Sequence, residues 1–219
     1  MKDFMLFSEP WWVNLFIFIP FAAFYFWRKH GLAISVGTLV VCACFGAAFG
    51  FVEAAVVVYL RAAVGLLPGY GGSLADVARL SSDIYQKAQI HSDLPQSLLT
   101  VEIFREAATI VMLLSVAFLS AKSLRERTAI FLWSFAIWDL CYYLGLHLTV
   151  GWPPSWFTPD VLFLIPVPWL AQVWFPILVS ALSLLAIILV RKPDARGAVP
   201  SGMNATKVDS AGTSGTASR

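Results

Sequence analysis

Charged residues are scarce in this sequence. Asp, Glu, Lys and Arg make up 13% of its 219 residues, whereas a soluble domain carries about a quarter. Hydrophobic residues account for 59%, and the mean hydropathy is +0.76. A chain of this composition would not stay in water, so we exclude a soluble protein and expect the lipid bilayer as its partner.

The signature motifs of soluble enzymes and nucleic-acid-binding proteins are also missing. The formal net charge is only +2, and no basic run alternates with aromatic residues, so we expect no nucleic acid partner. No C-x-x-C, H-E-x-x-H, phosphate-binding glycine loop or G-x-S-x-G sequence occurs. The three cysteines, Cys42, Cys44 and Cys141, lie in apolar runs, which is typical of small packing residues. No cofactor can therefore be named from motifs.

Five long apolar stretches dominate what is present. Each approaches or exceeds the roughly 20 residues that cross a hydrocarbon core of about 30 Å. They lie near residues 11–27, 32–60, 98–121, 128–150 and 171–190. We expect the first to be a retained helix rather than a signal peptide, because Arg28 and Lys29 follow it and no small-residue cleavage site does. Residues 1–192 are thus predicted to form an all-α bundle of about five transmembrane helices.

Basic residues predict the orientation of this bundle. Lys and Arg near helix ends stay on the cytoplasmic side of a membrane. They cluster at residues 28–30, 122–127 and 191–196, which fall on one side when the five spans alternate in direction. The sequence therefore predicts an outside N-terminus and a cytoplasmic C-terminus. Its short loops favour a bacterial plasma membrane.

Two outer segments and the tail complete the expected organisation. In the first, Ser73 and Asp76 form a capping box that predicts a short interfacial helix. The second, residues 151–170, holds five prolines and three tryptophans. It fits either a re-entrant segment over the outer end of the bundle or a stiff aromatic-belt loop. Residues 193–219 are rich in Gly, Ser, Thr and Ala and are predicted to be a disordered cytoplasmic tail.

Ionisable residues within the apolar stretches are the strongest functional signal. Each costs at least about 2.5–3.5 kcal/mol to insert into a bilayer, so each requires a reason. Counting about 1.5 Å per residue from the outer helix ends places them in the outer half of the membrane, and those of each span share one face. We therefore predict a single polar site. Its candidate catalytic residues are Glu53, Glu102, Arg105, Glu106 and Asp139, and its candidate substrate-binding residues are Tyr142, Tyr143 and His147.

A ridge of small residues predicts where the second span packs. Gly46, Gly50 and Ala54 recur every four residues. Such a small-xxx-small pattern lets another helix approach closely. Packing explains the glycines, but it requires no carboxylate at the neighbouring Glu53.

The charges of the candidate site do not balance. Four carboxylates face one arginine, and full ionisation would leave about three uncompensated negative charges in a low-dielectric layer. Some carboxylates are therefore expected to be protonated, hydrated in a cavity or bound to a cation, and each of these is a functional property. The structural alternative is that Arg105 pairs with nearby carboxylates only to fix the bundle. It leaves Glu53 unexplained.

Four segments carry a resemblance to known proteins. They are Glu102-Ile-Phe-Arg-Glu-Ala107, Trp138-Asp-Leu-Cys-Tyr-Tyr143, Gly151-Trp-Pro-Pro-Ser155 and Asp160-Val-Leu-Phe-Leu-Ile-Pro166. Over about residues 50–182 the chain resembles a group of small multi-pass bacterial membrane proteins, and this resemblance implies a membrane bundle but no activity. A looser likeness in architecture, without a shared motif, is to small membrane-embedded cyclases and isomerases that protonate lipid-soluble substrates with intramembrane carboxylates.

Four functions fit these features. The first is an intramembrane acid–base enzyme on a lipid-soluble substrate, with a protonated Glu or Asp as the acid and a second carboxylate or His147 as the base. The second is a metal site, although the third span lacks the Glu-x-x-His pattern of helical di-iron bundles. Its candidate ligands are Glu53, Glu102, Glu106, Asp139 and His147. The third is proton or cation transport, with a homo-oligomer supplying further helices, and the fourth is a non-catalytic subunit of a membrane complex.

Overall fold

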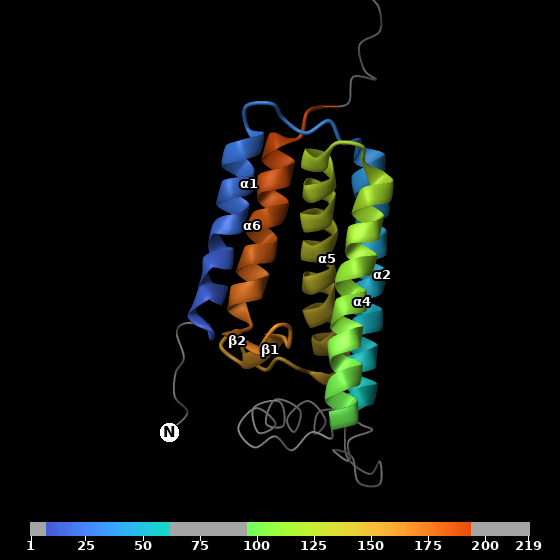
Figure 1. Ribbon diagram of the computed structural model, residues 1–219, viewed down its shortest axis with the longest axis vertical. Coiled ribbons are helices and arrows are strands. Elements are labelled where there is room, and N and C mark those ends of the chain that lie inside the picture. Colours follow the sequence, from blue (N-terminus) through green and yellow to red (C-terminus); the bar gives the residue numbers. More distant parts are fainter. Residues whose placement is uncertain (1–7, 62–95, 194–219) are drawn as a thin grey trace, which may run out of the picture.

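The computed structural model describes residues 8–61 and 96–193 of the chain. The predicted interfacial helix at Ser73 and the predicted tail lie outside these ranges. Within them, the chain forms roughly parallel helices and one β-hairpin (Figure 1). The elements are η1 (Trp11–Phe18), α1 (Ile19–Trp27), α2 (Val36–Arg61), α4 (Gln96–Ser120), α5 (Leu124–Val150), β1 (Pro159–Phe163), β2 (Trp169–Gln172) and α6 (Trp174–Val190).

Three helical segments are long and apolar enough to cross a membrane. They cover Val36–Tyr59, Thr100–Ser120 and Leu124–Val150. Trp11–Trp27, formed by η1 and α1, and Trp174–Val190 are shorter apolar helices. All five coincide with predicted spans, and no boundary differs by more than four residues. The prediction of a mostly helical chain with apolar helices long enough to cross a membrane is confirmed for these three segments.

The prediction of an all-α fold is wrong for residues 151–170. Part of this segment is an antiparallel hairpin in which Pro159 lies opposite Gln172 and Val161 opposite Leu170. Leu170 also exchanges backbone hydrogen bonds of 2.7 and 2.8 Å with Glu9, which joins the N-terminal segment to the hairpin. The prolines at 166 and 168 do prevent a helix, but they lie in the turn, where no ladder N–H is needed. The branched and aromatic residues before them favour a strand.

α2 and α5 approach each other most closely at the predicted ridge of small residues. A Cβ atom added at Gly46 would lie 2.8 Å from the carbonyl oxygen of Ser134, and one added at Gly50 would collide with that of Trp138. On α5, a Cβ atom added at Gly145 would lie 3.2 Å from the side chain of Ala54 on α2. The predicted helix contact is therefore confirmed, and α5 is the helix that fits against the ridge.

α5 is the central helix of the bundle. Ser123 caps its start by accepting a hydrogen bond of 3.2 Å from the N–H of Glu126, and Gly151 ends it in the left-handed conformation at φ 68°. α2, α4 and α6 all pack against α5, while α1 packs against α6. Leu32 links the ends of α1 and α6, because its N–H donates to Val190 and its carbonyl accepts from Lys192.

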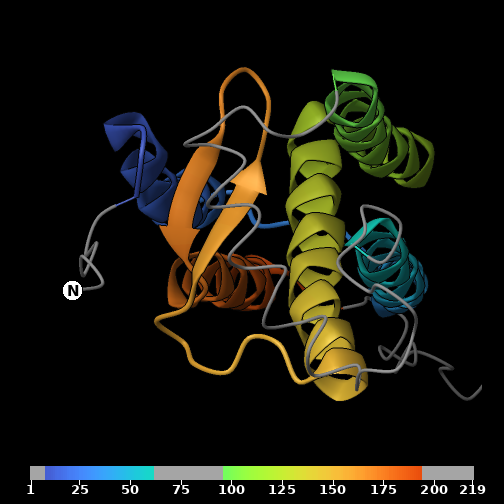
Figure 2. The same ribbon diagram turned by 90° about the horizontal axis from the view of Figure 1, so that it is seen from below.

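The hairpin lies across one end of the bundle, between α1 and α6 on one side and α5 and α4 on the other (Figure 2). We call this the hairpin end. The α1–α2 and α4–α5 connections and the end of α6 meet at the opposite end (Figure 1). The hairpin thus closes the space between helices at the depth where the ionisable residues were predicted.

Candidate functional site

A cavity of about 110 Å³ at the hairpin end collects most of the predicted site residues. We call it the polar cavity. η1, α2, α4, α5, α6 and the hairpin all contribute to its wall. Seven of the eight candidates line it: Glu53, Glu102, Arg105, Glu106, Asp139, Tyr142 and Tyr143. Each of the four carboxylate residues among them is at most 7% exposed. The structure therefore brings these side chains to one buried space, contributed by three different helices.

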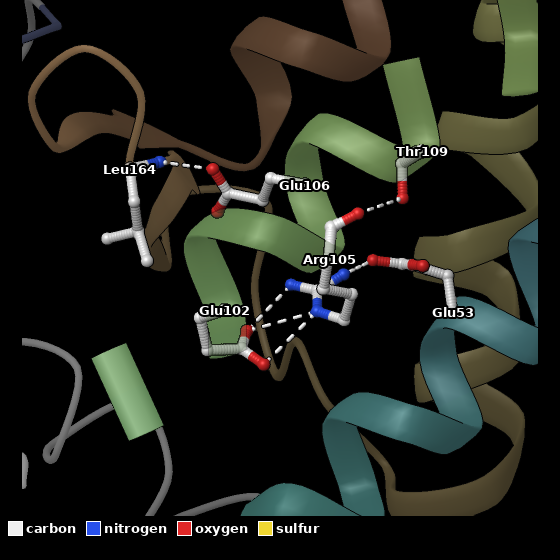
Figure 3. Close-up of polar contacts among 6 residues, drawn as sticks. All are labelled: Glu53, Glu102, Arg105, Glu106, Thr109 and Leu164. Atoms are coloured by element: carbon white, nitrogen blue, oxygen red, sulfur yellow. Dashed lines mark hydrogen bonds and ion pairs between the residues drawn. The ribbon is translucent and has the colours of Figure 1, made fainter. Parts of the chain in front are cut away.

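Arg105 is held between two carboxylates from different helices (Figure 3). One turn earlier on α4, Glu102 accepts hydrogen bonds from Arg105 Nε at 3.1 Å and from Nη2 at 2.7 Å. Arg105 Nη1 forms an ion pair with Glu53 of α2. A forked guanidinium contact of this kind fixes direction as well as charge. The guanidinium therefore links α4 to α2.

Glu106 follows Arg105 in sequence but points the other way. Its Oε2 accepts a hydrogen bond of 2.7 Å from the backbone N–H of Leu164, in the turn of the hairpin (Figure 3). The side chains of neighbouring residues on a helix point about 100° apart around its axis, so Arg105 and Glu106 contact different partners. Glu106 thus links α4 to the hairpin.

Asp139 and Asp160 also line the polar cavity, and each accepts a hydrogen bond from a hydroxyl group. Ser180 of α6 donates a hydrogen bond of 2.8 Å to Asp139 Oδ2, and the hydroxyl of Tyr143 donates one of 2.8 Å to Asp160 Oδ2. Asp160, which is 8% exposed, is a site residue that the sequence analysis missed. It stands at the start of an apolar run. The cost of burying a carboxylate applies to the outer segment as well as to the helices, and this criterion predicts Asp160 as a site residue.

The charge imbalance is larger than predicted. Five carboxylates and one guanidinium line the polar cavity, an excess of four negative charges if all ionise. Glu53 and Glu102 are occupied by Arg105. In the parts of the chain that the structure describes, Glu106 and Asp139 have no Lys or Arg in ion-pair contact. Glu106 and Asp139 are therefore carboxyl groups of the predicted site that the Arg105 guanidinium does not contact, although Arg105 attracts Glu106 electrostatically.

No family model matches the chain, and no curated protein or solved structure does either. The function must therefore be inferred from the residues themselves. The resemblance to small multi-pass bacterial membrane proteins stays a prediction.

His147 is not brought to the polar cavity, which corrects its predicted place in the wall. Its side chain is exposed, and Nδ1 lies 3.3 Å from the carbonyl oxygen of Pro153. His147 shares a face with Tyr143, but it is one turn further along α5, about 12 Å from the level of Asp139. The segment after α5 folds back there, so His147 meets that segment instead of the hairpin.

The predicted metal ligands do not converge on one point. Across residues 8–61 and 96–193, no group of three or more His, Cys, Asp and Glu side chains is arranged to hold a metal ion. The geometry explains this, because Arg105 separates Glu53 from Glu102 and the hairpin holds Glu106.

An apolar groove of about 490 Å³ adjoins the polar cavity. Residues of η1, α1, α4, α5, α6 and the hairpin line it, among them Ile19 of α1 and Ala107 and Ile110 of α4. Glu106 and Ser180 line both the groove and the polar cavity. The volume is within the range of about 300–1,000 Å³ that is usual for small-molecule sites. Polar and apolar spaces thus meet at Glu106 and Ser180.

Proposed function

We propose that the polar cavity is the active site of a membrane-embedded enzyme that carries out acid–base chemistry on a lipid-soluble substrate. The observation that carries this proposal is the position of Glu106, which borders both the polar cavity and the apolar groove. Ser180, the hydrogen-bond donor to Asp139, borders both as well. A substrate in the groove would therefore reach Glu106 directly and Asp139 through the adjoining polar cavity, and neither carboxyl group has a Lys or Arg in ion-pair contact in the described part of the chain.

Glu106 and Asp139 are the acid and base in this proposal. The excess of carboxylates requires that some be protonated, hydrated or paired with a cationic ligand. A protonated carboxyl group donates a proton to the substrate, and an ionised neighbour accepts one. Arg105 is a positioning residue, because Glu53 and Glu102 occupy its guanidinium. Tyr143 orients Asp160 through its hydroxyl.

A purely structural role for these residues explains less. Three polar contacts do hold the helices and the hairpin together. They join Arg105 to Glu53, Leu164 to Glu106, and Ser180 to Asp139. Well-packed apolar side chains would hold them at equal or lower cost, since burying ion pairs is often no more stabilising than apolar packing. A purely structural role also does not require a cavity next to a groove. A functional site explains both the buried polar residues and the adjoining spaces.

Replacing Glu106 with glutamine or Asp139 with asparagine is expected to reduce substrate conversion by about 10²- to 10⁴-fold, the usual contribution of a general acid or base. Purified protein is incubated in D₂O with a lipid extract of its own membrane, and untargeted mass spectrometry follows lipid amounts and deuterium content. The wild type should change at least one lipid species. Glu126→Gln, at the opposite end of α5, is the control and should keep full conversion. If no lipid differs between wild type and a protein-free sample, the enzyme proposal is refuted.

We also propose that five segments cross the membrane, with the hairpin end outside. η1 and α1 have 8 and 9 residues and together reach about 30 Å at about 2.0 and 1.5 Å per residue. α6 has 17 residues, the lower limit for a crossing helix. The basic residues between α1 and α2, between α4 and α5, and after α6 gather at the opposite end. Their common side supports a cytoplasmic location for that end.

Reporter fusions test this orientation. Alkaline phosphatase is active only outside the cytoplasm, so a fusion after Ser155 should be active and one after Ser123 inactive. A fluorescent protein that matures only in the cytoplasm serves as the control and should give the reverse pattern. Phosphatase activity at Ser123 but not at Ser155 would invert the orientation. Equal activity at both sites would show that α5 does not cross the membrane.

A further inference from the structure

We infer that the polar cavity and the apolar groove together bind one single-chain amphiphile with an ammonium head group. The head lies in the polar cavity near Glu106 and Asp139, and the chain lies in the groove. This inference rests on the proposed function, because it names the substrate class of the same site. It is carried by the shape of the combined space, by its charge and by its aromatic wall.

The shape of the combined space fits one chain with a small head. The groove has apolar walls, with Ile110, Phe131 and Leu132 among its lining residues, and it joins the polar cavity at Glu106. The polar cavity is smaller, with about 110 Å³. A single water needs about 10–15 Å³ measured in this way, so the polar cavity accommodates several waters or one small head group.

The groove has lining residues from α1 and α4, namely Ile19 on α1 and Ala107 on α4, and the hairpin contributes Phe163 and Trp169. α4 packs mainly against α5. An opening between α1 and α4 would let the chain of an amphiphile enter from the bilayer without crossing water, and this route is part of the inference.

The charge of the polar cavity selects the head group. No Lys or Arg among the described residues forms an ion pair with Glu106 or Asp139, and Asp160 adds a third carboxylate. Like charges brought together cost several kcal/mol, so a carboxylate or phosphate head is disfavoured. An ammonium group supplies the missing positive charge and also donates hydrogen bonds.

The aromatic wall favours an ammonium group independently of the carboxylates. Trp138 stacks on Tyr142 at 6.2 Å between ring centroids, and Phe163 lies 6.4 Å from Trp138 and 5.1 Å from Trp169. All of these rings line the polar cavity. Aromatic faces attract organic cations, and aromatic cages are the usual site for quaternary ammonium groups.

Three photoreactive probes test this inference on the full chain in lipid nanodiscs. They share one diazirine-bearing hexadecyl chain and differ only in the head, which is an amine, a hydroxyl or a carboxylate. The amine probe should label peptides of α4 and α5 that line the groove at least about tenfold more than the carboxylate probe, as expected for a difference above 1.4 kcal/mol. Equal labelling by the amine and carboxylate probes would overturn the inference.

A matched pair of variants tests the location of the chain. Ala107→Trp adds a large side chain at a position on α4 that lines the groove and should reduce labelling by the amine probe about tenfold or more. Ala108→Trp adds the same side chain to the next position, which is exposed and lines neither space, and should label like the wild type. Equal labelling of both variants would place the chain elsewhere and refute the groove. The probe series needs only the wild type, so it stands even if Ala107→Trp fails to fold.

The same measurements separate this inference from the proposed enzyme. Amine-selective labelling without any lipid conversion in D₂O would refute acid–base catalysis and leave the ligand class standing. Lipid conversion by a protein that labels equally with all three probes would support catalysis and overturn the ammonium head group.

Discussion

Replacing Arg105 with alanine is expected to lower the free energy of unfolding by about 3–5 kcal/mol, the usual cost of removing one partner of a buried ion pair. The substitution leaves Glu53 and Glu102 buried, at 5% and 3% exposure, without their guanidinium. It also removes the polar link between α4 and α2. Unfolding by SDS in mixed micelles, followed by far-ultraviolet circular dichroism, measures the loss.

Glu53→Gln is the matched control for Arg105→Ala. An amide at this position keeps the shape of the side chain and still accepts a hydrogen bond from Arg105, which remains paired with Glu102. The loss should therefore be about 1–3 kcal/mol, the cost of a weakened buried hydrogen bond. A loss below about 1 kcal/mol for Arg105→Ala would show that water compensates the carboxylates. Equal losses for the two variants would mean that the ion pair to Glu53 alone holds the network.

Glu106→Gln should behave differently from Arg105→Ala, because the amide oxygen can still accept the hydrogen bond from Leu164. Stability should change little while conversion is lost. This contrast separates residues that hold the site from residues that perform the chemistry. It also follows from the geometry, since Arg105 is surrounded by carboxylates and Glu106 borders the groove.

The convergence of Glu53, Arg105 and Asp139 could be predicted from sequence because lipid penalises exposed ionisable groups so strongly. Once the spans are placed, each such side chain must face the interior, and its position along the helix gives its depth. The partner of Arg105 within α4 could be predicted from helical spacing. Residues three apart share a face of a helix, so Glu102 pairs with Arg105, whereas the side chain of Glu106 is turned by about 100° from that of Arg105.

The hairpin could not be predicted in this way. A short apolar run such as residues 161–165 fits a strand, a buried helix or an interfacial segment equally well by periodicity. Its pairing with β2 and Glu9 depends on partners that are distant in sequence. The groove depends on how far α4 lies from α1, which no local pattern encodes. His147 was misplaced because helical face is easier to infer than the path of the chain beyond the helix.

Replacing Gly50 with valine should destabilise the protein by about 3 kcal/mol, at the upper end of the cost of overpacking. A Cβ atom at this position would collide with the carbonyl oxygen of Trp138 and lie 3.0 Å from both Cys141 Cβ and Tyr142 N. Backbone atoms cannot move aside alone, so α2 and α5 must separate. Glu53 lies one turn after Gly50 and Asp139 one residue after Trp138. Separation therefore also moves both carboxylates, and amine-probe labelling should fall with stability.

Gly37→Val provides the matched control on the same helix. A Cβ atom at Gly37 would meet only Ser35 Oγ, at 3.7 Å, and the position is exposed. Valine and glycine are both modest helix formers, so the change in unfolding free energy should stay within about 0.5 kcal/mol. SDS unfolding and probe labelling of the two variants, measured side by side, decide the matter. If Gly50→Val is as stable as Gly37→Val, the close contact between α2 and α5 is wrong, and the placement of Glu53 beside Arg105 fails with it.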